Sequence, residues 1–393
     1  MSLFSNIQRL PQLDVSERRV FVRADLDVVV SSFGGVVDDT ELRRALPTLR
    51  YLVNQRSKVI VGAHYGTAAQ PAPENTPRCV ARRLTELLGA EVVLLERDFA
   101  GQVGLLEPGQ IALTPNLLDY SEELEGDAVF AHLLARSLDV YVGDGLRSAA
   151  LSVASVTALP RALSLRGAGL RLAQELDLLE LLADPPAGRY VAVVGGDSFA
   201  RKSRLLWALL LKADAVLLGG VVANTCLAAQ GWRPGQSAVE VEQLDAARAW
   251  LDAARGSGVT VSMPQDALVV DPRIGLDSLI SRDIQQVAEH EAVVDIGMKT
   301  CARYREALCY ASTVVCSGLM GAEHSDATLA GTYRVWQAAT TSAASTAIFG
   351  ARSVATADRL DVLGPFGHAP SGGSASLALM SGTVLPGVES LRS

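Results

Sequence analysis

The chain has 393 residues, of which 49% are hydrophobic, and carries a formal net charge of −8. This length predicts two domains with large buried cores. The negative charge argues against nucleic acid or an anionic membrane as the main partner. No apolar run reaches the ~18 residues of a membrane span, and the first residues lack the apolar segment of a secretory signal. We therefore expect a cytoplasmic protein.

Five cysteines are present, an odd number, and no two have the C-x-x-C spacing of many metal and redox sites. Reduced, buried thiols are the expected state in a cytoplasmic protein. We predict no metal site built from these cysteines and no structural disulfide.

Short segments that are almost wholly apolar recur along the chain and are bounded by Gly, Asp or Ser. Continuous rather than alternating hydrophobicity predicts strands that are covered on both faces. In chain order they are 19–30, 58–64, 91–96, 139–144, 190–197, 215–220, 259–264, 292–297, 313–318 and 346–351.

Between these segments apolar residues recur at helical spacing, for example over 41–55 and over 243–258. The second pattern ends at Gly258, as a helix C-terminus commonly does. Repeated strand–helix alternation predicts parallel α/β layers. The stretch 165–184 predicts a long amphipathic helix, and the alternation restarts after Pro185 and Pro186. We therefore predict two α/β domains joined by a connecting helix.

Glycine-containing turns follow several predicted strands, at Gly195-Gly196, Gly219-Gly220, 317–323 and 370–376. A strand, a glycine turn and a helix start together aim backbone N–H groups at an anion. A single such glycine is more often a structural turn residue. Asp197 opposes a phosphate in the first turn, and no P-loop lysine pattern is present.

The order and spacing of these motifs resemble the phosphoglycerate kinase family over essentially the whole chain. The segments that carry the resemblance include "RVFVRADLDV", "DVYVGDGL", "VVGGDSFARKS", "LLGGVVANTCLAAQGW", "DIGMKT", "SGLMGAE" and "SGGSASLALMSGTVLPGVESL". The resemblance implies a glycolytic kinase fold of two Rossmann-like domains. The N-terminal one, 1–172, would hold 3-phosphoglycerate, and the C-terminal one, 173–377, would hold MgATP or MgADP. Residues 378–393 would return to the N-terminal domain. The ligand would lie in an interdomain cleft, and we expect a monomer.

On the substrate side the resemblance implies contacts from Arg23, Asp25, Asp27, His64, Gly372 and Gly373. Asp27 stands where the family has Asn. Four further positions at which the family has arginine are changed here, to Glu41, Thr67, Leu118 and Leu151. Without those arginines, Arg23 can also be an ordinary partner of Asp25, Asp27 or Glu41, and His64 can be structural.

On the nucleotide side the resemblance implies contacts from Gly195, Gly196, Lys202, Gly219, Gly220, Lys299, Gly318 and Glu323. Lys202 is also the candidate catalytic residue. Ser198 replaces one family lysine, and Arg352 stands where an aspartate would lie beside the magnesium. We expect weak ATP or ADP binding and no Mg²⁺ ligand supplied by the protein.

Two interpretations of function remain open. Each lost charge-assisted hydrogen bond costs about 1.5–3 kcal/mol, and phosphoryl transfer depends on positioning and charge neutralisation. The sequence alone therefore favours an impaired or inactive family member that binds a ligand or regulates a partner. The alternative is an active phosphoglycerate kinase that uses Arg23, His64, Lys202 and Lys299 in an atypical site.

Overall fold

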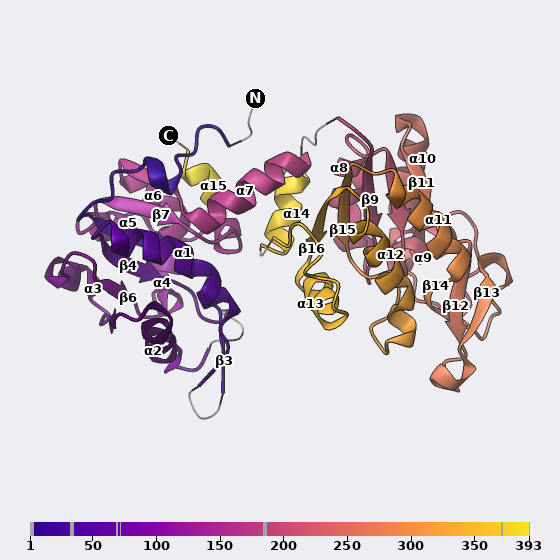
Figure 1. The fold of residues 1–393 in the computed structure, drawn as a ribbon, viewed down its shortest axis with the longest axis horizontal. Helices are drawn as coiled ribbons and strands as arrows, with labels where there is room; N and C mark the ends of the chain where they lie inside the picture. The colour runs from indigo at the N-terminus through magenta and orange to yellow at the C-terminus, as the bar shows by residue number, and fades with distance from the viewer. Residues whose placement is uncertain are drawn as a thin grey trace. The chain divides into compact units, whose positions relative to one another are not determined.

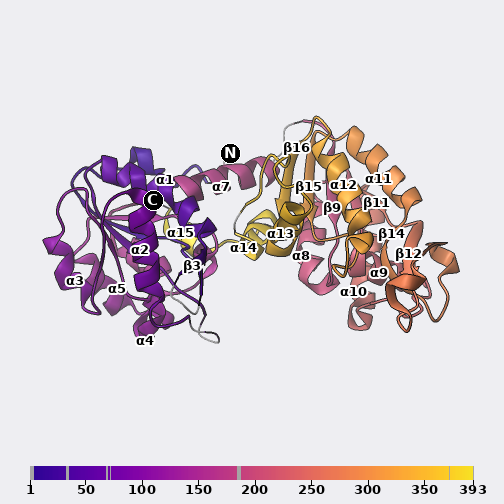
Figure 2. The same ribbon diagram turned by 60° about the horizontal axis from the view of Figure 1, so that its bottom comes forward.

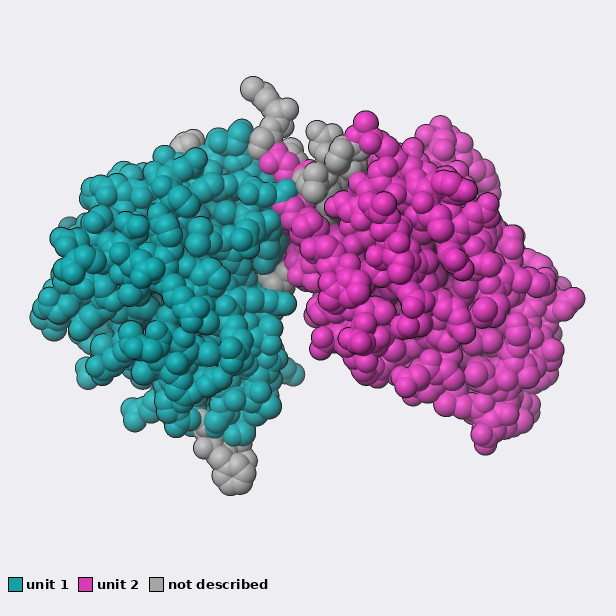
Figure 3. Space-filling model, in the orientation of Figure 1, with its two compact units in different colours: residues 1–177, 384–393 teal, residues 178–383 magenta. Residues whose placement is uncertain are grey.

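The structure is a computed structural model that describes residues 4–31, 35–67, 70, 72–183, 187–370 and 372–392. The chain forms two compact units. Unit 1 comprises Met1–Asp177 and Val384–Ser393, and unit 2 comprises Leu178–Thr383 (Figure 3). Each unit is described by itself below.

Unit 1 contains a six-stranded parallel sheet in the order β5-β6-β4-β1-β7-β8. Its strands are β1 (Arg19–Arg23), β4 (Lys58–Gly62), β5 (Val92–Leu94), β6 (Ile111–Leu113), β7 (Val140–Gly143) and β8 (Leu165–Ala168). An antiparallel pair, β2 (Val29–Val30) and β3 (Val36–Asp38), leads into the first long helix. The helices are α1 (Thr40–Asn54), α2 (Thr76–Leu88), α3 (Phe99–Gln102), α4 (Ser121–Leu124), α5 (Ala128–Ala135), α6 (Leu159–Ala162), α7 (Leu170–Ala183) and α15 (Pro386–Ser390).

Unit 2 contains a five-stranded parallel sheet in the order β11-β10-β9-β15-β16 and a three-stranded antiparallel sheet in the order β13-β12-β14. The parallel strands are β9 (Tyr190–Val194), β10 (Ala215–Leu218), β11 (Thr260–Ser262), β15 (Thr313–Ser317) and β16 (Ser345–Phe349). The antiparallel strands are β12 (Asp266–Val270), β13 (Ile280–Asp283) and β14 (Ala292–Ile296). The helices are α8 (Phe199–Leu209), α9 (Gly220–Ala229), α10 (Leu244–Ser257), α11 (Met298–Cys309), α12 (Ala330–Thr340), α13 (Ala351–Arg359) and α14 (Ser374–Met380).

The predicted fold class, two Rossmann-like α/β domains that each contain a parallel sheet, is confirmed. The strands β7 and β9 are buried along their whole length, as continuous apolar runs predict. Helices α11 and α12 lie side by side against the unit 2 sheet in both views (Figures 1 and 2). Helix α10 ends at Ser257 and is followed by Gly258, whose φ of 83° is the left-handed conformation that glycine favours.

The predicted connecting helix begins later than expected. Residues 165–168 form strand β8, which pairs in parallel with β7, and α7 starts only at Leu170. Gly167 explains the difference, because a Cβ there would lie 2.5 Å from the Gln8 carbonyl oxygen. The N-terminal segment packs so closely on β8 that only glycine fits at position 167. The spacing of apolar residues in the sequence does not reveal this contact.

The end of the chain belongs to unit 1. Helix α15 packs on the 3-10 turn η4 (Ser148–Ala150) and on the π-helical turn η5 (Ala154–Ala158). The Ser390 hydroxyl donates to the Val156 carbonyl at 2.8 Å, and Arg392 forms a bridge with Ile7. Figure 1 shows α15, in yellow, among the early elements of this unit. Among the residues that the structure describes, no helix is long and apolar enough to cross a membrane.

The contact of α15 generates a stability prediction. A Cβ on buried Gly387 would lie 2.6 Å from the Ala149 Cα and 2.8 Å from the Val156 Cγ1. Overpacking of this kind costs about 1–3 kcal/mol, so we expect Gly387→Val to lower the urea midpoint of the full chain. Val384→Ala, at a residue that is 59% exposed, is the control and should leave the midpoint unchanged. An unchanged midpoint for Gly387→Val would show that α15 does not stabilise unit 1.

Candidate functional site

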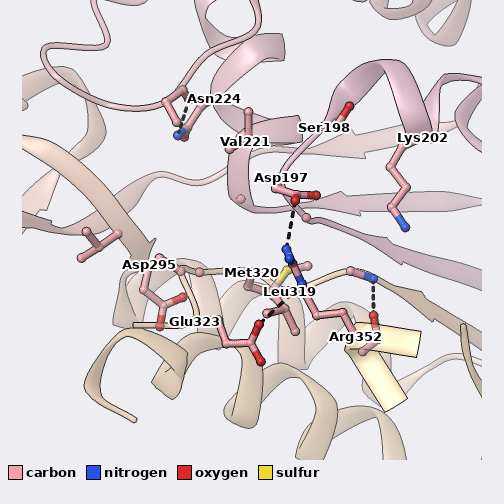
Figure 4. A pocket seen from close by; sticks show the side chains of 18 of the residues that line it. Asp197, Ser198, Lys202, Val221, Asn224, Asp295, Leu319, Met320, Glu323 and Arg352 are labelled. Carbon is pink, nitrogen blue, oxygen red and sulfur yellow. Dashed lines mark hydrogen bonds and ion pairs between the residues drawn. The ribbon is translucent and has the colours of Figure 1, made fainter. Parts of the chain in front are cut away.

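A cavity of about 880 Å³ lies within unit 2 (Figure 4). Its walls come from the segments that follow β9, β10, β15 and β16, with β14 along one side. The strands end level with one another, because Val194 pairs with both Leu218 and Ser317, and Ser317 pairs with Phe349. Parallel sheets bind ligands at this carboxyl edge.

The glycine turns at this edge pack on one another. A Cβ on Gly195 would lie 2.2 Å from the Leu319 carbonyl oxygen, and one on Gly318 would lie 2.2 Å from the Gly195 carbonyl oxygen. Gly195 N donates to the Ser317 carbonyl at 2.9 Å, and Gly196 N donates to the Leu319 carbonyl at 2.8 Å. The N–H groups of Gly195 and Gly196 are therefore used inside the protein and do not form a phosphate cradle.

The N-terminus of α8 is occupied by a carboxylate from elsewhere in the chain. Glu240 accepts hydrogen bonds from the backbone N–H groups of Phe199 and Ala200 and from the Ser198 hydroxyl at 2.7 Å. Ser198 is the N-cap, and its hydroxyl accepts from Arg201 N at 3.2 Å. The sequence predicted an anion site at this helix start, and Glu240 supplies the anion.

The N-terminus of α13, by contrast, is open. Gly350, Ala351, Arg352 and Ser353 line the cavity, and within the described residues no side chain caps this helix. The first N–H groups of a helix have no partner within it and carry partial positive charge. Of the two helix starts, α13 is the one that can accept an anionic ligand.

One chain of ion pairs crosses the cavity. Arg352 contacts Asp197 at 2.9 Å and Glu323 at 3.5 Å (Figure 4). Asp197 also contacts Arg201 at 2.5 Å. Partial burial opposes ionisation of Asp197, yet the hydrogen bond from Arg201 and the charge of Arg352 keep its pKa below the ordinary value. Arg352 and Asp197 are 62% and 53% exposed, and exposed pairs contribute only about 0–1 kcal/mol. An incoming ligand can therefore separate them.

Lys202 is a partly buried cation in the cavity wall. Its Nζ donates to the Ser317 hydroxyl at 2.6 Å, and it forms no ion pair with any residue in the described ranges. Partial burial, together with the charge of Arg201, lowers the pKa of Lys202 to about 8. An ammonium group that is desolvated without a carboxylate gains from an anionic ligand.

The structure brings together most of the predicted nucleotide-side residues. Gly196, Lys202, Gly220, Gly318 and Glu323 line the cavity. Gly195 and Gly219 lie one residue behind it in the turns. Lys299 does not belong to this group, because it is exposed on α11 and is not part of the cavity wall.

In unit 1 the predicted substrate residues follow β1. Asp25 is buried and accepts hydrogen bonds from Arg147 N and Ser148 N, both at 3.0 Å. Arg147 also contacts Asp27 at 2.6 Å. Glu41 contacts Arg171 at 2.5 Å and Arg44 at 2.7 Å. Besides Arg23, three arginines therefore lie near the expected substrate positions.

Arg23 does not pair with the carboxylates considered from the sequence. Its Nε donates to the Ser155 hydroxyl at 3.1 Å and one amino nitrogen donates to the Ala24 carbonyl at 2.8 Å. The other amino nitrogen is buried and has no hydrogen-bond partner among the residues described. An unsatisfied buried donor is costly, so this guanidinium group favours an anionic ligand.

Glu123 holds the predicted His64 in place. The Glu123 carboxylate is fully buried and contacts His64 Nε2 at 2.8 Å and the Ser155 hydroxyl at 2.6 Å. Burial opposes its ionisation, but hydrogen bonds from His64 and Ser155 and the charge of Arg23 hold the Glu123 pKa below its usual value. Burial also lowers the pKa of His64, so a neutral ring donates its Nε2–H to the carboxylate.

The changed arginine positions lie in the same unit. Leu118 lies in the 3-10 turn η3 (Leu117–Asp119) and Leu151 follows η4, while Thr67 donates its backbone N–H to the Gln70 carbonyl. Gly372 and Gly373 belong to unit 2, where they precede α14. Gly373 has a φ of 56°, which favours glycine.

Sequence reasoning missed Glu123, Arg147, Arg171 and Glu240. Arg147 carries a usable signal, because it lies four residues after the end of β7, at the same sheet edge as Asp25. Glu240 has no comparable signal, because it lies about 40 residues from the helix that it caps. In the described ranges no group of three His, Cys, Asp or Glu side chains could hold a metal ion.

The chain is similar to known proteins in both sequence and fold. A sequence model of the phosphoglycerate kinase family matches residues 10–383. The phosphoglycerate kinase of Acaryochloris marina is 35% identical, with 98% of each chain covered, and that of Anaeromyxobacter sp. strain K is 33% identical at the same coverage. The chain belongs to the phosphoglycerate kinase family. Phosphoglycerate kinase from Coxiella burnetii has a TM-score of 0.92 at 30% identity, covering 98% of both chains.

The buried carboxylate of Glu123 generates a pH prediction. Because its folded pKa lies below the unfolded value of about 4.3, its stabilisation is complete above that pH and is lost as the pH falls through the folded pKa. We expect Glu123→Gln to cost about 1.5–3 kcal/mol of unfolding free energy at pH 7, with a smaller difference below pH ~4. Urea denaturation at several pH values measures this.

The matched control is Glu122→Gln, because Glu122 is the exposed neighbour on the same short helix. Glu122→Gln should leave the unfolding free energy nearly unchanged at pH 7 and at pH 3. A Glu123→Gln cost that stayed constant from pH 7 to pH 3 would contradict the assignment of an ionised Glu123.

Proposed function

We propose that this chain is a phosphotransferase that moves a phosphoryl group between an adenine nucleotide and the carboxyl group of 3-phosphoglycerate. The observation that carries the proposal is that the open α13 N-terminus and the partly buried Lys202 share one cavity of about 880 Å³. The family relationship, at 35% identity over 98% of the chain, supports the same reaction.

The cavity has the properties that a nucleotide requires. Its volume lies within the range of about 300–1,000 Å³ typical of ligand pockets, and Val221, Leu319 and Met320 supply apolar wall. The phosphates would lie toward the α13 N–H groups and the Lys202 ammonium, where positive charge is concentrated. Transfer of a phosphoryl group needs mainly this positioning and charge neutralisation.

Magnesium would arrive with the nucleotide rather than on a protein site. Asp197 and Glu323, the acidic side chains nearest Arg352, are both in contact with its guanidinium group. The residues present therefore fit a nucleotide phosphate better than a protein-held cation, and no step of the proposal depends on a protein ligand to the metal.

A second candidate function is nucleotide binding without transfer. It is favoured by Glu41, a carboxylate at a position where the resemblance implies an arginine, in contact with buried Arg171. A coupled assay for 1,3-bisphosphoglycerate formation separates the two. We expect measurable turnover, below the median enzyme rate of about 10 s⁻¹. Nucleotide binding with no turnover would support the second candidate instead.

Lys202 provides a direct test of the nucleotide site. A charge-assisted hydrogen bond contributes about 1.5–3 kcal/mol, so we expect Lys202→Met to weaken ATP binding roughly ten- to hundredfold. Because the Lys202 pKa is lowered to about 8, wild-type affinity should fall as the pH rises through that value, when the neutral amine forms. Titration calorimetry between pH 7 and pH 9 measures both effects.

The control for this titration is Lys212→Met, because Lys212 is exposed beyond the end of α8. It should retain the wild-type affinity and its pH dependence. A Lys202→Met variant that binds ATP like the wild type, or that keeps the same decline above pH 8, would contradict the proposed phosphate contact.

Arg352 provides a test of the magnesium dependence. We expect ATP to stabilise the wild type to a similar extent with and without Mg²⁺, because Arg352 attracts the free phosphate. In Arg352→Asp the new carboxylate repels free ATP and can contact the metal of MgATP. Thermal-shift titrations should then show stabilisation only with Mg²⁺. Equal magnesium dependence of the two proteins would rule out this role.

A further inference from the structure

Arg147 is held at the carboxyl edge of the unit 1 sheet by its own backbone. The turn after β7 donates the N–H groups of Arg147 and Ser148 to the two oxygens of Asp25, each at 3.0 Å. Gly145 permits this contact, since a Cβ there would lie 2.4 Å from the Asp25 Cγ. The side chain of Arg147 therefore starts from a fixed point beside the β1 carboxylates.

The Arg147 guanidinium group is held only weakly. It contacts Asp27 at 2.6 Å, and the two side chains are 49% and 41% exposed. Water and salt screen pairs with this exposure, so their net stabilisation is small. Its second acidic neighbour, Glu41, lies 3.9 Å away.

Glu41 does not depend on Arg147. It contacts Arg171 at 2.5 Å and Arg44 at 2.7 Å, and Arg171 is only 7% exposed. If Arg147 moved, Glu41 would keep two arginine partners. Of the arginines that contact Asp27 or Glu41 in the described ranges, Arg147 is the most exposed, which makes it the one best able to change partner.

Arg23 is a second cationic donor in the same region of unit 1. Arg23 is 2% exposed, and one of its amino nitrogens has no partner among the described residues. The charges of Arg23 and Asp27 both act on the pKa of His64, so these three side chains lie in the same region of unit 1. The proposed anion site therefore has a half-exposed arginine, Arg147, in contact with Asp27, and a buried arginine, Arg23, in the same region of unit 1.

We propose that Arg147 leaves Asp27 to bind the anionic group of the acceptor substrate, a phosphate monoester or a carboxylate, and that Asp27 is its resting counter-ion. The inference rests on the proposed function for the identity of the acceptor. It assigns to Arg147 a contact that the changed positions Glu41, Thr67, Leu118 and Leu151 cannot make. A planar guanidinium group can bind such an anion in bidentate fashion.

Titration calorimetry on the full chain, with 3-phosphoglycerate and with inorganic phosphate, tests the proposal. We expect Arg147→Ala to weaken 3-phosphoglycerate binding about tenfold or more. Asp27→Asn removes the competing carboxylate and should tighten binding several-fold. Arg147→Lys, which keeps the charge and loses the bidentate geometry, should be intermediate. A response to inorganic phosphate as well identifies the phosphate as the group that Arg147 binds, and a response to 3-phosphoglycerate alone identifies the carboxylate.

Arg43→Ala is the matched control. Arg43 is also an arginine of unit 1, 56% exposed and in contact with one aspartate, Asp39. It should leave the affinity within about twofold. A purely structural Arg147–Asp27 pair predicts a different result, in which Arg147→Ala and Asp27→Asn both lower the urea midpoint and neither changes anion affinity. That result, or a wild type that binds neither anion, would overturn the proposal.

The experiment also separates this inference from the proposed function. If the wild type transfers no phosphoryl group but anion binding responds to Arg147 and Asp27 as expected, the proposed function fails and the Arg147 site stands. If the wild type is active and Arg147→Ala leaves its KM for 3-phosphoglycerate unchanged, the Arg147 site fails and the proposed function stands. Should Arg147→Ala fail to fold, tighter binding by Asp27→Asn still supports the site, and unchanged binding refutes it.

Discussion

Parallel pairing in register is the constraint on which both sites depend. In unit 2, Val194, Leu218, Ser317 and Phe349 end their strands level with one another, so four separate segments open at one edge. In unit 1 the pairing of Arg23 with Gly143 brings the turn that carries Arg147 to the carboxylates that follow β1. A shift in the register of one strand would separate these groups.

The ion pairs of the two sites differ mainly in exposure. The Arg171–Glu41 pair is almost fully buried, and breaking it would leave an uncompensated charge away from water. The Arg352–Asp197 and Arg147–Asp27 pairs are about half exposed, and their partners can be exchanged at little cost. The charges that can respond to a ligand are therefore the exposed ones, whereas the buried pair maintains the shape of the site.

Much of the fold follows from the sequence because buried parallel strands and amphipathic helices leave periodic patterns. Strand β8 is not evident from the sequence, because its Gly167 is required by the close approach of the Gln8 backbone and not by a periodic pattern. The site is harder to predict, because its contacts join residues that are distant in sequence. Arg147 and Asp27 are 120 residues apart, and Glu240 lies about 40 residues from the helix that it caps.

The positive charge near Glu41 also comes from residues that are distant in sequence. Glu41 and Leu118 stand where the resemblance implies arginines. In the structure, Arg147 and Arg171 lie beside Glu41, although neither is near it in the sequence. Ser198, at a position where the resemblance implies a lysine, caps α8 together with Glu240. A substitution changes the electrostatics of a site only in combination with its spatial neighbours.

The carboxylate at the start of α8 has a consequence for inhibition by simple ions. Because Glu240 already satisfies that helix end, sulfate, phosphate or chloride in the surrounding solution has nothing to gain there. Within the part of the chain that the structure describes, the start of α13 has no such resident group. Small anions should therefore accumulate on the α13 side of the cavity, where the phosphates of the proposed nucleotide would lie, and the ionic composition of the medium would set the apparent affinity for nucleotide.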